Sequence, residues 1–97
     1  MWIKTQIRYC LINTDNADYI CIDIPRKGIA CKLKNSENTL VIATYNTPEE
    51  CMKVFAGINT ALFGGIPVLE LPLGGDIDSW ASNVDEASLK WIAAGRP

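Results

Sequence analysis

The groups with the potential to do chemistry in this chain are the side chains of four cysteines and a few neighbouring acids, and the main-chain amides of two Gly-Gly pairs. The chain has no histidine, which removes the usual general base near neutral pH, the common nucleophile arrangements and the commonest zinc ligand. The cysteines follow no C-x-x-C spacing, so neither a zinc ribbon nor a redox motif is expected. They are Cys10, Cys21, Cys31 and Cys51. We therefore predict no catalytic residues, no metal site and no cofactor.

Two groups could still serve an enzyme, the Asp76/Asp78 pair and Cys51. Acid–base catalysis needs one carboxyl with a raised pKa in an apolar pocket, but these aspartates lie in a polar connector rich in Gly, Ser and Asn. Cys51 falls in the first turn of a predicted helix, where the helix dipole could lower a thiol pKa. It also lies on the apolar stripe of that helix and follows two glutamates. We predict a structural thiol and a protein that is not an enzyme.

The Gly-Gly pairs enclose the stretch "FGGIPVLELPLGGD" and raise the question of a phosphate-binding loop. Gly64-Gly65 follows a helix, where carbonyls rather than amides are exposed, and no nucleotide-binding pattern is present. A ligand site would have to combine the second glycine pair with bases from the first half of the chain. The candidate ligand-binding residues are Arg26, Lys27, Lys32, Lys34, Gly74 and Gly75.

The charge is unevenly divided between the two halves of the chain. Residues 1–48 carry six bases and four acids, whereas residues 49–97 carry three bases and seven acids. Duplex nucleic acid is not expected as a partner, because phosphate contacts need a much larger basic excess. No apolar run has the length of a membrane span, and the first ten residues lack the apolar core of a signal peptide. We expect a cytoplasmic protein with reduced thiols and no membrane partner.

The first half of the chain must be built from strands. Ile20, Ile22 and Ile24 alternate with Tyr19, Cys21 and Asp23, the period of a half-buried strand. The following "PRKG" is a turn signal, and "IACKLK" and "TLVIATY" repeat the strand pattern. With shorter strands upstream, the prediction is an antiparallel meander of about five strands. Their ranges are 1–6, 8–13, 19–24, 29–34 and 39–45.

Two helices are expected in the second half. Thr47 is the predicted N-cap, Pro48 the first helical residue and Glu50 the capping-box partner. This amphipathic helix should run over 48–62, stop at Gly64 or Gly65, and cover the isoleucines of the meander. A second, shorter helix is predicted after Asn83, ending at Gly95, with residues 76–83 as a connector.

The segment Ile66–Leu73 is predicted to be an edge strand, because it is too apolar for a free loop and contains Pro67 and Pro72. Whether it pairs with its own sheet or with another chain is left open by the sequence. We expect one α+β domain, with a core over 1–63 and a strand-and-helix tail over 64–97. The predicted interface residues are Ile66, Val68, Leu69, Leu71, Leu73, Trp80 and Trp91.

Three segments carry a resemblance to known proteins: "MWIKTQ", "LINTDNADYICI" and "ATYNTPEECMKVFAGI". In order and spacing they resemble a group of short, functionally uncharacterised proteins from Gram-positive bacteria and their phages. The resemblance covers about residues 1–63 and implies a β-meander plus one helix, similar to a reduced pleckstrin-homology-like module. It implies no catalytic residues, and from Gly64 onward the chain departs from the pattern.

These observations predict a non-catalytic binding module that forms a homo-oligomer, with the tail completing the interface. The alternative, which rests on the resemblance, is a phage-encoded anti-defence inhibitor. Such an inhibitor would sequester a small signalling nucleotide or block a host immune protein.

Overall fold

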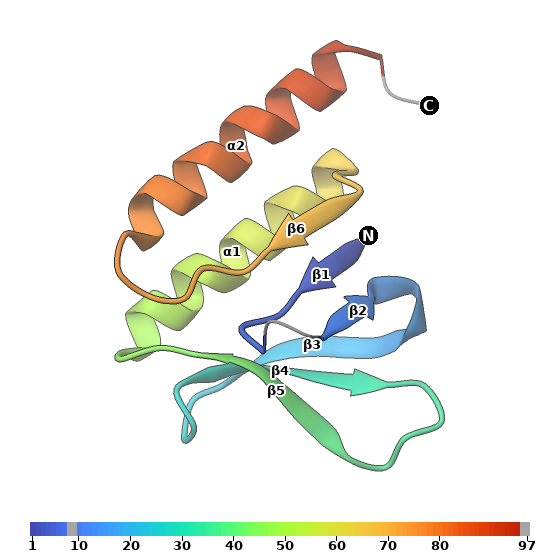
Figure 1. Ribbon diagram of the computed structural model, residues 1–97, viewed down its shortest axis with the longest axis vertical. Helices are drawn as coiled ribbons and strands as arrows, with labels where there is room; N and C mark the ends of the chain where they lie inside the picture. Colours follow the sequence, from blue (N-terminus) through green and yellow to red (C-terminus); the bar gives the residue numbers. More distant parts are fainter. Residues whose placement is uncertain (8–9, 96–97) are drawn as a thin grey trace.

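The computed structural model describes residues 1–7 and 10–95 of the chain, so Arg8 and Tyr9 of the predicted strand 8–13 lie outside the described residues. The fold is α+β, as predicted, with two helices and two small sheets (Figure 1). In chain order the elements are β1 (Trp2–Lys4), β2 (Leu11–Asn13), the 3-10 turn η1 (Thr14–Asn16), β3 (Ala17–Asp23), β4 (Gly28–Leu33), β5 (Thr39–Thr44), α1 (Pro48–Gly64), β6 (Val68–Glu70) and α2 (Ile77–Ala93).

The strands form two three-stranded sheets, with the orders β2-β1-β6 and β3-β4-β5. The second sheet is the antiparallel meander expected from its alternating residues and turns. The first sheet separates β1 and β2 from that meander and adds β6 in parallel to β1. The prediction of one five-stranded meander is therefore wrong, because β1 takes its partners from the segment beside it and from a strand 66 residues away.

Gln6 and Tyr45 join the two sheets. The Gln6 amide N–H donates to Ile42 of β5, and its side chain donates to the carbonyl of Pro72, just after β6. The Tyr45 hydroxyl donates to the same Pro72 oxygen over 2.8 Å. Burial raises the pKa of Tyr45, so the phenol stays protonated and keeps this donor role.

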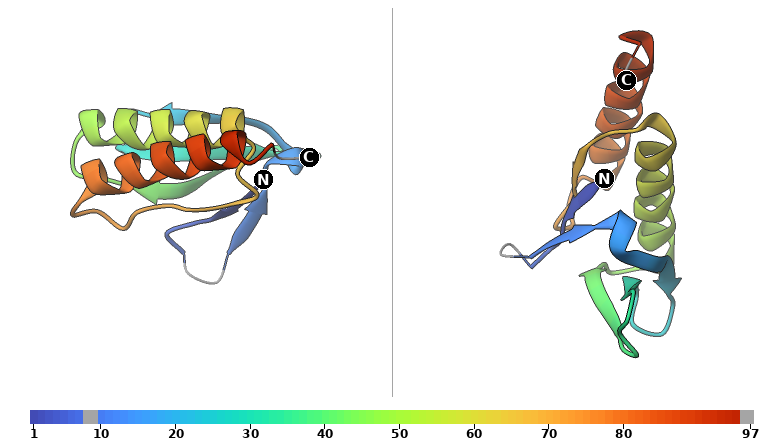
Figure 2. Two further views of the ribbon diagram at one scale, coloured as in Figure 1. Left: turned by 90° about the horizontal axis from the view of Figure 1, so that it is seen from above. Right: turned by 90° about the vertical axis from the view of Figure 1, so that its right-hand side faces the viewer.

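Helix α1 begins and ends at the predicted signals. The Thr47 hydroxyl accepts from the Glu50 amide, Pro48 occupies the first turn, and Gly65 adopts the left-handed conformation with φ 74°. Its apolar residues Cys51, Val54 and Ile58 are buried, and the helix packs against β3 and β4. This helix therefore covers one face of the β3-β4-β5 sheet (Figure 2).

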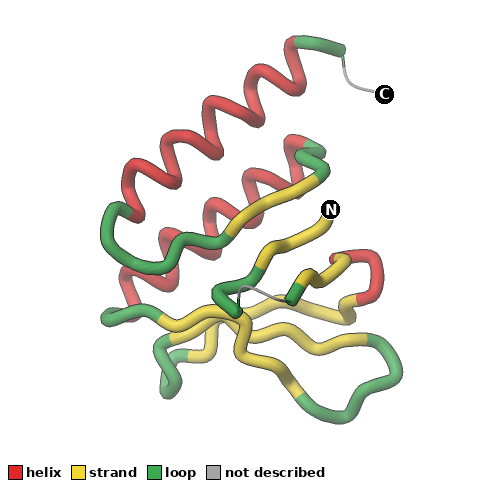
Figure 3. The backbone as a smooth tube through the Cα atoms, viewed as in Figure 1, coloured by secondary structure: helices red, strands yellow, loops and turns green. Residues whose placement is uncertain are grey.

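Strand β6 belongs to the chain's own sheet. Its residue Leu69 lies beside Ile3 of β1, and Leu71 donates its amide N–H to Lys4. The Leu69 and Leu71 side chains are 4% and 2% exposed, and such burial stabilises a fold by about 2 kcal/mol for each leucine. Figure 3 shows β6 running beside β1 and leading into α2.

Helix α2 begins seven residues before the predicted start, because Asp76 rather than Asn83 is its N-cap. The Asp76 carboxylate accepts from the Ser79 amide over 3.0 Å. The segment predicted as a connector is helical because Trp80 and Val84 pack on α1, and this packing outweighs the weak helix propensity of its Ser and Asn residues. The C-terminal helix therefore has 17 residues and is as long as α1.

Small residues on α1 allow the two helices to approach closely. A Cβ placed on Gly57 would lie 2.4 Å from the Trp80 ring, and one on Gly64 would lie 2.8 Å from the Ser88 Cβ. Both distances are shorter than carbon atoms tolerate, so only glycine fits at these two positions without a shift of the neighbour. The interface between the helices thus fixes the position of the Trp80 indole.

Candidate interaction surface

The two sheets have four outer edges, and the described residues cover these edges to different extents. The β5 edge is used by Gln6, whose amide donates to Ile42 and whose side-chain oxygen accepts from the Thr44 amide. The β6 edge has three residues and is covered at Glu70 by the Trp80 indole, which donates to the Glu70 carbonyl over 2.7 Å. The β2 edge is also only three residues long. Strand β3 has seven residues and no such cover within the described part of the chain.

The register of β3 shows which of its main-chain groups face outward. The Lys34 amide N–H, just after β4, donates to the Asn16 carbonyl, just before β3. The main-chain groups of Lys34 therefore point toward β3. Main-chain direction alternates along a strand, so the amide and carbonyl groups of every second residue of β4 also point toward β3. These residues are Lys32, Ala30 and Gly28, and their partners in the register are Tyr19, Cys21 and Asp23. The intervening residues Ile20 and Ile22 consequently direct their amide and carbonyl groups away from the sheet. Two residues on this edge can accept and donate hydrogen bonds to an added strand.

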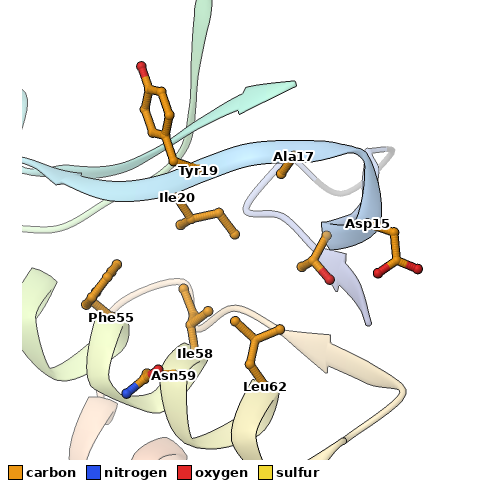
Figure 4. Close-up of a pocket in the computed structure, with 9 residues that line it drawn as sticks. Asp15, Ala17, Tyr19, Ile20, Phe55, Ile58, Asn59 and Leu62 are labelled. Atoms are coloured by element: carbon orange, nitrogen blue, oxygen red, sulfur yellow. The ribbon is translucent and has the colours of Figure 1, made fainter. Parts of the chain in front are cut away.

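An apolar groove lies between β3 and α1, directly beside this edge. It has a volume of about 370 Å³. Figure 4 shows Ile20 pointing from β3 toward α1, where Phe55, Ile58 and Leu62 face it. Asn59 and Asp15 add polar groups to the lining. Side chains of an added strand that point toward α1 would enter this groove.

A second groove lies on the opposite face of β3. It has a volume of about 450 Å³, and its lining mixes apolar and polar residues from β3, the following turn and the two neighbouring strands: Tyr19, Cys21, Ile22, Asp23, Ile24, Pro25, Arg26, Ala30 and Thr39. Successive side chains of a strand point to opposite faces of a sheet. A strand added at β3 would therefore place alternate side chains in the two grooves.

The residues that flank β3 in the chain are opposite in charge at its two ends, whereas the acids within the strand, Asp18 and Asp23, are paired with Lys32 and Arg26. Asp15 precedes the strand, is exposed and lines the groove beside α1. Arg26 and Lys27 follow the strand in its turn to β4 and are also exposed. The Arg26 guanidinium lies 3.5 Å from the Asp23 carboxylate, an exposed ion pair that contributes little to stability.

The six predicted ligand-binding residues do not gather in one pocket. Arg26 and Lys27 lie at one end of β4, and Lys32 and Lys34 lie toward its other end, where Lys32 forms an ion pair with Asp18. The Gly74-Gly75 pair lies in the connection from β6 to α2, in left-handed conformations with φ 125° and 70°. These glycines serve the turn that leads into the N-cap of α2.

The seven predicted interface residues divide into three groups. Leu69 and Leu71 lie in the chain's own core, and Trp80 packs on Gly57. Val68 and Leu73 are exposed. Ile66 is half-buried against the core, and Trp91 lies at the exposed side of α2. Burial within the chain therefore explains the apolar character of Ile66, Leu69, Leu71 and Trp80, but not that of the other three residues.

A further apolar surface lies where the C-terminal turns of the two helices meet. Phe63, Leu89 and Ile92 are exposed there and line a groove of about 350 Å³. The main chain on both sides of this groove is helical and already hydrogen-bonded internally. The groove therefore specifies the shape of an occupant less closely than the β3 edge does.

The groups considered for catalysis have other roles in the structure. Cys51 is buried, and desolvation followed by the neighbouring Glu50 charge raises the pKa of its thiol. Asp76 caps α2, and Asp78 forms an exposed ion pair with Lys53 over 2.8 Å. Within residues 1–7 and 10–95 no cluster of three or more Cys, Asp or Glu side chains is placed to hold a metal ion.

None of the helices in the described ranges is long and apolar enough to cross a membrane. No family model, curated protein or solved structure matches the chain. The resemblance to the short proteins of Gram-positive bacteria and phages therefore stays an expectation.

Proposed function

We propose that this protein is a non-catalytic interaction module that binds an extended polypeptide segment as an added strand on β3. The open β3 edge carries this proposal, because Ile20 and Ile22 direct main-chain hydrogen-bonding groups outward from a seven-residue strand. Pairing main-chain groups with an extended peptide is a recurrent mode of recognition, in which side-chain pockets add specificity.

The two grooves beside β3 support this mode of binding. The groove toward α1 is lined by Ile20, Phe55 and Ile58 and suits apolar side chains. The groove on the other face combines the charged Asp23 and Arg26 with apolar residues such as Ile24 and suits side chains of mixed character. The expected ligand is consequently a segment with apolar residues at alternate positions and residues of mixed character between them. An inhibitor that blocks a host immune protein, the alternative expected from the resemblance, would use the same edge.

A selection of random dodecapeptides displayed on phage tests the proposal. Peptides enriched on the native chain should have apolar residues at alternate positions and should not bind Ile22→Pro, which lacks the outward amide of β3. They should still bind Ile22→Ala, which keeps this amide, and Val68→Lys, which changes the exposed face of β6. Enriched peptides that bind Ile22→Pro as well as the native chain would show that the β3 edge is not the binding site.

A further inference from the structure

We propose that the strand added to β3 is β3 of a second copy of this chain, paired antiparallel about a twofold axis at Cys21. This inference rests on the proposed function of the β3 edge and names its partner. The result is a homodimer with one continuous six-stranded antiparallel sheet, in the order β5-β4-β3 of one copy followed by β3-β4-β5 of the other.

The hydrogen-bonding groups of β3 select this register. An axis at Cys21 places Ile20 of each copy opposite Ile22 of the other, so all the outward amide and carbonyl groups of these two residues pair. An axis at Ile20 would instead pair Ile22 with Asp18, inside the irregularity between Ala17 and Tyr19. An axis at Ile22 would pair Ile20 with Ile24, whose carbonyl already accepts from Lys27.

The β3 side chains that face each other across the two copies are compatible in this register. On the face toward α1, Ile20 of one copy would lie beside Ile22 of the other, and both are half-buried in the single chain. On the opposite face Tyr19 would lie beside Asp23, and the two Cys21 side chains would meet at the axis. The register places no like charges directly opposite each other on this edge, which favours pairing.

The charged residues that flank β3 in the chain also match in an antiparallel pair. The end of β3 that carries Asp15 would lie beside the end of the other copy that carries Arg26 and Lys27. The attraction occurs twice, because the twofold axis repeats it. A second copy therefore supplies an extended strand with apolar residues at alternate positions and flanking residues of complementary charge.

Disulfide trapping of single positions tests the register. Cα atoms at a non-hydrogen-bonded antiparallel pair lie about 4.5 Å apart, which is within the range that a disulfide spans. In Cys10→Ser, oxidation with diamide should link two chains through Cys21, because Cys31 and Cys51 are buried. In the Cys10→Ser, Cys21→Ser background, a mixture of Tyr19→Cys and Asp23→Cys should give the mixed dimer, since these positions are opposite each other.

The same background provides the control for random collision. Tyr19→Cys alone should give little cross-linked dimer, because two Tyr19 positions do not meet in this register. Sedimentation equilibrium should give twice the chain mass of 10.7 kDa for the native protein. Ile22→Pro should weaken the dimer about tenfold or more relative to Ile22→Ala, because one amide is lost from each copy.

A native chain that stays monomeric at high micromolar concentration would overturn the dimer, as would equal cross-linking of the Tyr19→Cys homodimer and the mixed dimer. The peptide selection separates this failure from that of the proposed function. Edge-dependent peptides with a monomeric chain would mean that β3 accepts a strand from another protein. Failure of both experiments would overturn the proposed function as well.

Discussion

Strands β3 and β6 are both outer strands of three-stranded sheets, but within residues 1–7 and 10–95 the edge of β6 is covered and that of β3 is open. Strand β6 is three residues long, lies between Pro67 and Pro72, and has the Trp80 indole on its Glu70 carbonyl. Strand β3 is seven residues long, contains no proline, and directs the groups of Ile20 and Ile22 to its outer side. Short strands, prolines and covering side chains are the usual protection of a sheet edge against unwanted pairing.

The difference shows which sheet edge the described residues protect and which edge they leave accessible to an added strand. The cover of β6 depends on more than one residue. The absence of a side chain at Gly57 leaves space for the Trp80 ring, and α2 positions the indole so that it bonds to Glu70. On β3 the nearest helix is α1, and it borders a groove rather than closing the edge. Substitutions on each of the two edges in turn test this difference.

The largest effect is expected from proline substitutions at neighbouring positions of β3. Cys21 points its amide toward β4, so Cys21→Pro should cost about 3 kcal/mol of unfolding free energy through a lost ladder bond and ring strain. Ile22 points its amide outward, so Ile22→Pro should differ from Ile22→Ala by less than about 1 kcal/mol. Urea unfolding at low protein concentration measures all three variants. Equal losses for Cys21→Pro and Ile22→Pro would mean that the outward direction of Ile22 is wrong.

The second-largest effect on unfolding free energy is expected from substitution of Trp80, which covers the edge of β6. Trp80→Ala should lower the unfolding free energy by about 3 kcal/mol, because a half-buried indole and its hydrogen bond are lost. Trp80→Phe keeps most of the ring and should cost about 1 kcal/mol, the contribution of the indole N–H bond to Glu70. Trp91→Ala is the control for loss of a tryptophan from the exposed side of α2, and it should cost about 1 kcal/mol or less.

Removal of the indole should also change how β6 behaves toward other chains. Light scattering should detect concentration-dependent association of Trp80→Ala that survives Ile22→Pro, because this association would start from β6 rather than β3. If Trp80→Ala with Ile22→Pro stays monomeric while folded, Trp80 is not what protects the β6 edge.

Local signals in the sequence predicted the elements whose structure is locally determined. The bounds of α1 follow from Thr47, Pro48 and the glycine after the helix, and the β3-β4-β5 hairpins follow from alternation and turn residues. The pairing of β1 with β6 could not be predicted in this way, because it joins segments distant in the chain. The early start of α2 depends on the packing of the Trp80 ring against Gly57. Local helix propensity gives no information on such a contact between two helices.

The candidate site shows the same division between local and distant information. The alternation of Ile20 and Ile22 predicted a strand and its inward face. The positions of β1, β2 and α1 in the fold make β3 an outer strand whose edge no other described residue covers. The apolar residues of β6 suggested a surface for a second chain, but Leu69 and Leu71 are used inside the chain's own core.

A smaller effect is expected at the contact that positions the Trp80 indole. Gly57→Ala adds a Cβ that would lie 2.4 Å from the Trp80 ring. The gain in helix propensity offsets part of the overpacking, so the net loss should be about 1 kcal/mol. In the Trp80→Ala background the ring is absent, and Gly57→Ala should stabilise by about 1 kcal/mol. The same sign in both backgrounds would mean that Trp80 does not limit this position.

The smallest effect is expected from the charges at the ends of β3. Asp15 is exposed, and its carboxylate has no ion-pair partner among the described residues, so Asp15→Lys should leave the monomer's stability nearly unchanged. In the antiparallel dimer the new lysine would face Lys27 of the other copy and weaken association about threefold. Lys27→Glu added to Asp15→Lys should restore the affinity, because the charges at the two ends are then exchanged.

Sedimentation of these variants at low and high salt checks the origin of the effect. Screening should bring Asp15→Lys and the native chain closer together as the salt concentration rises, because the charges involved are exposed. Asp85→Lys, a charge reversal on α2, is the control and should not alter association through β3. If Asp15→Lys and Asp85→Lys weakened the dimer equally, the effect would follow from net charge, and the opposite charges at the ends of β3 would have no role in aligning the two strands.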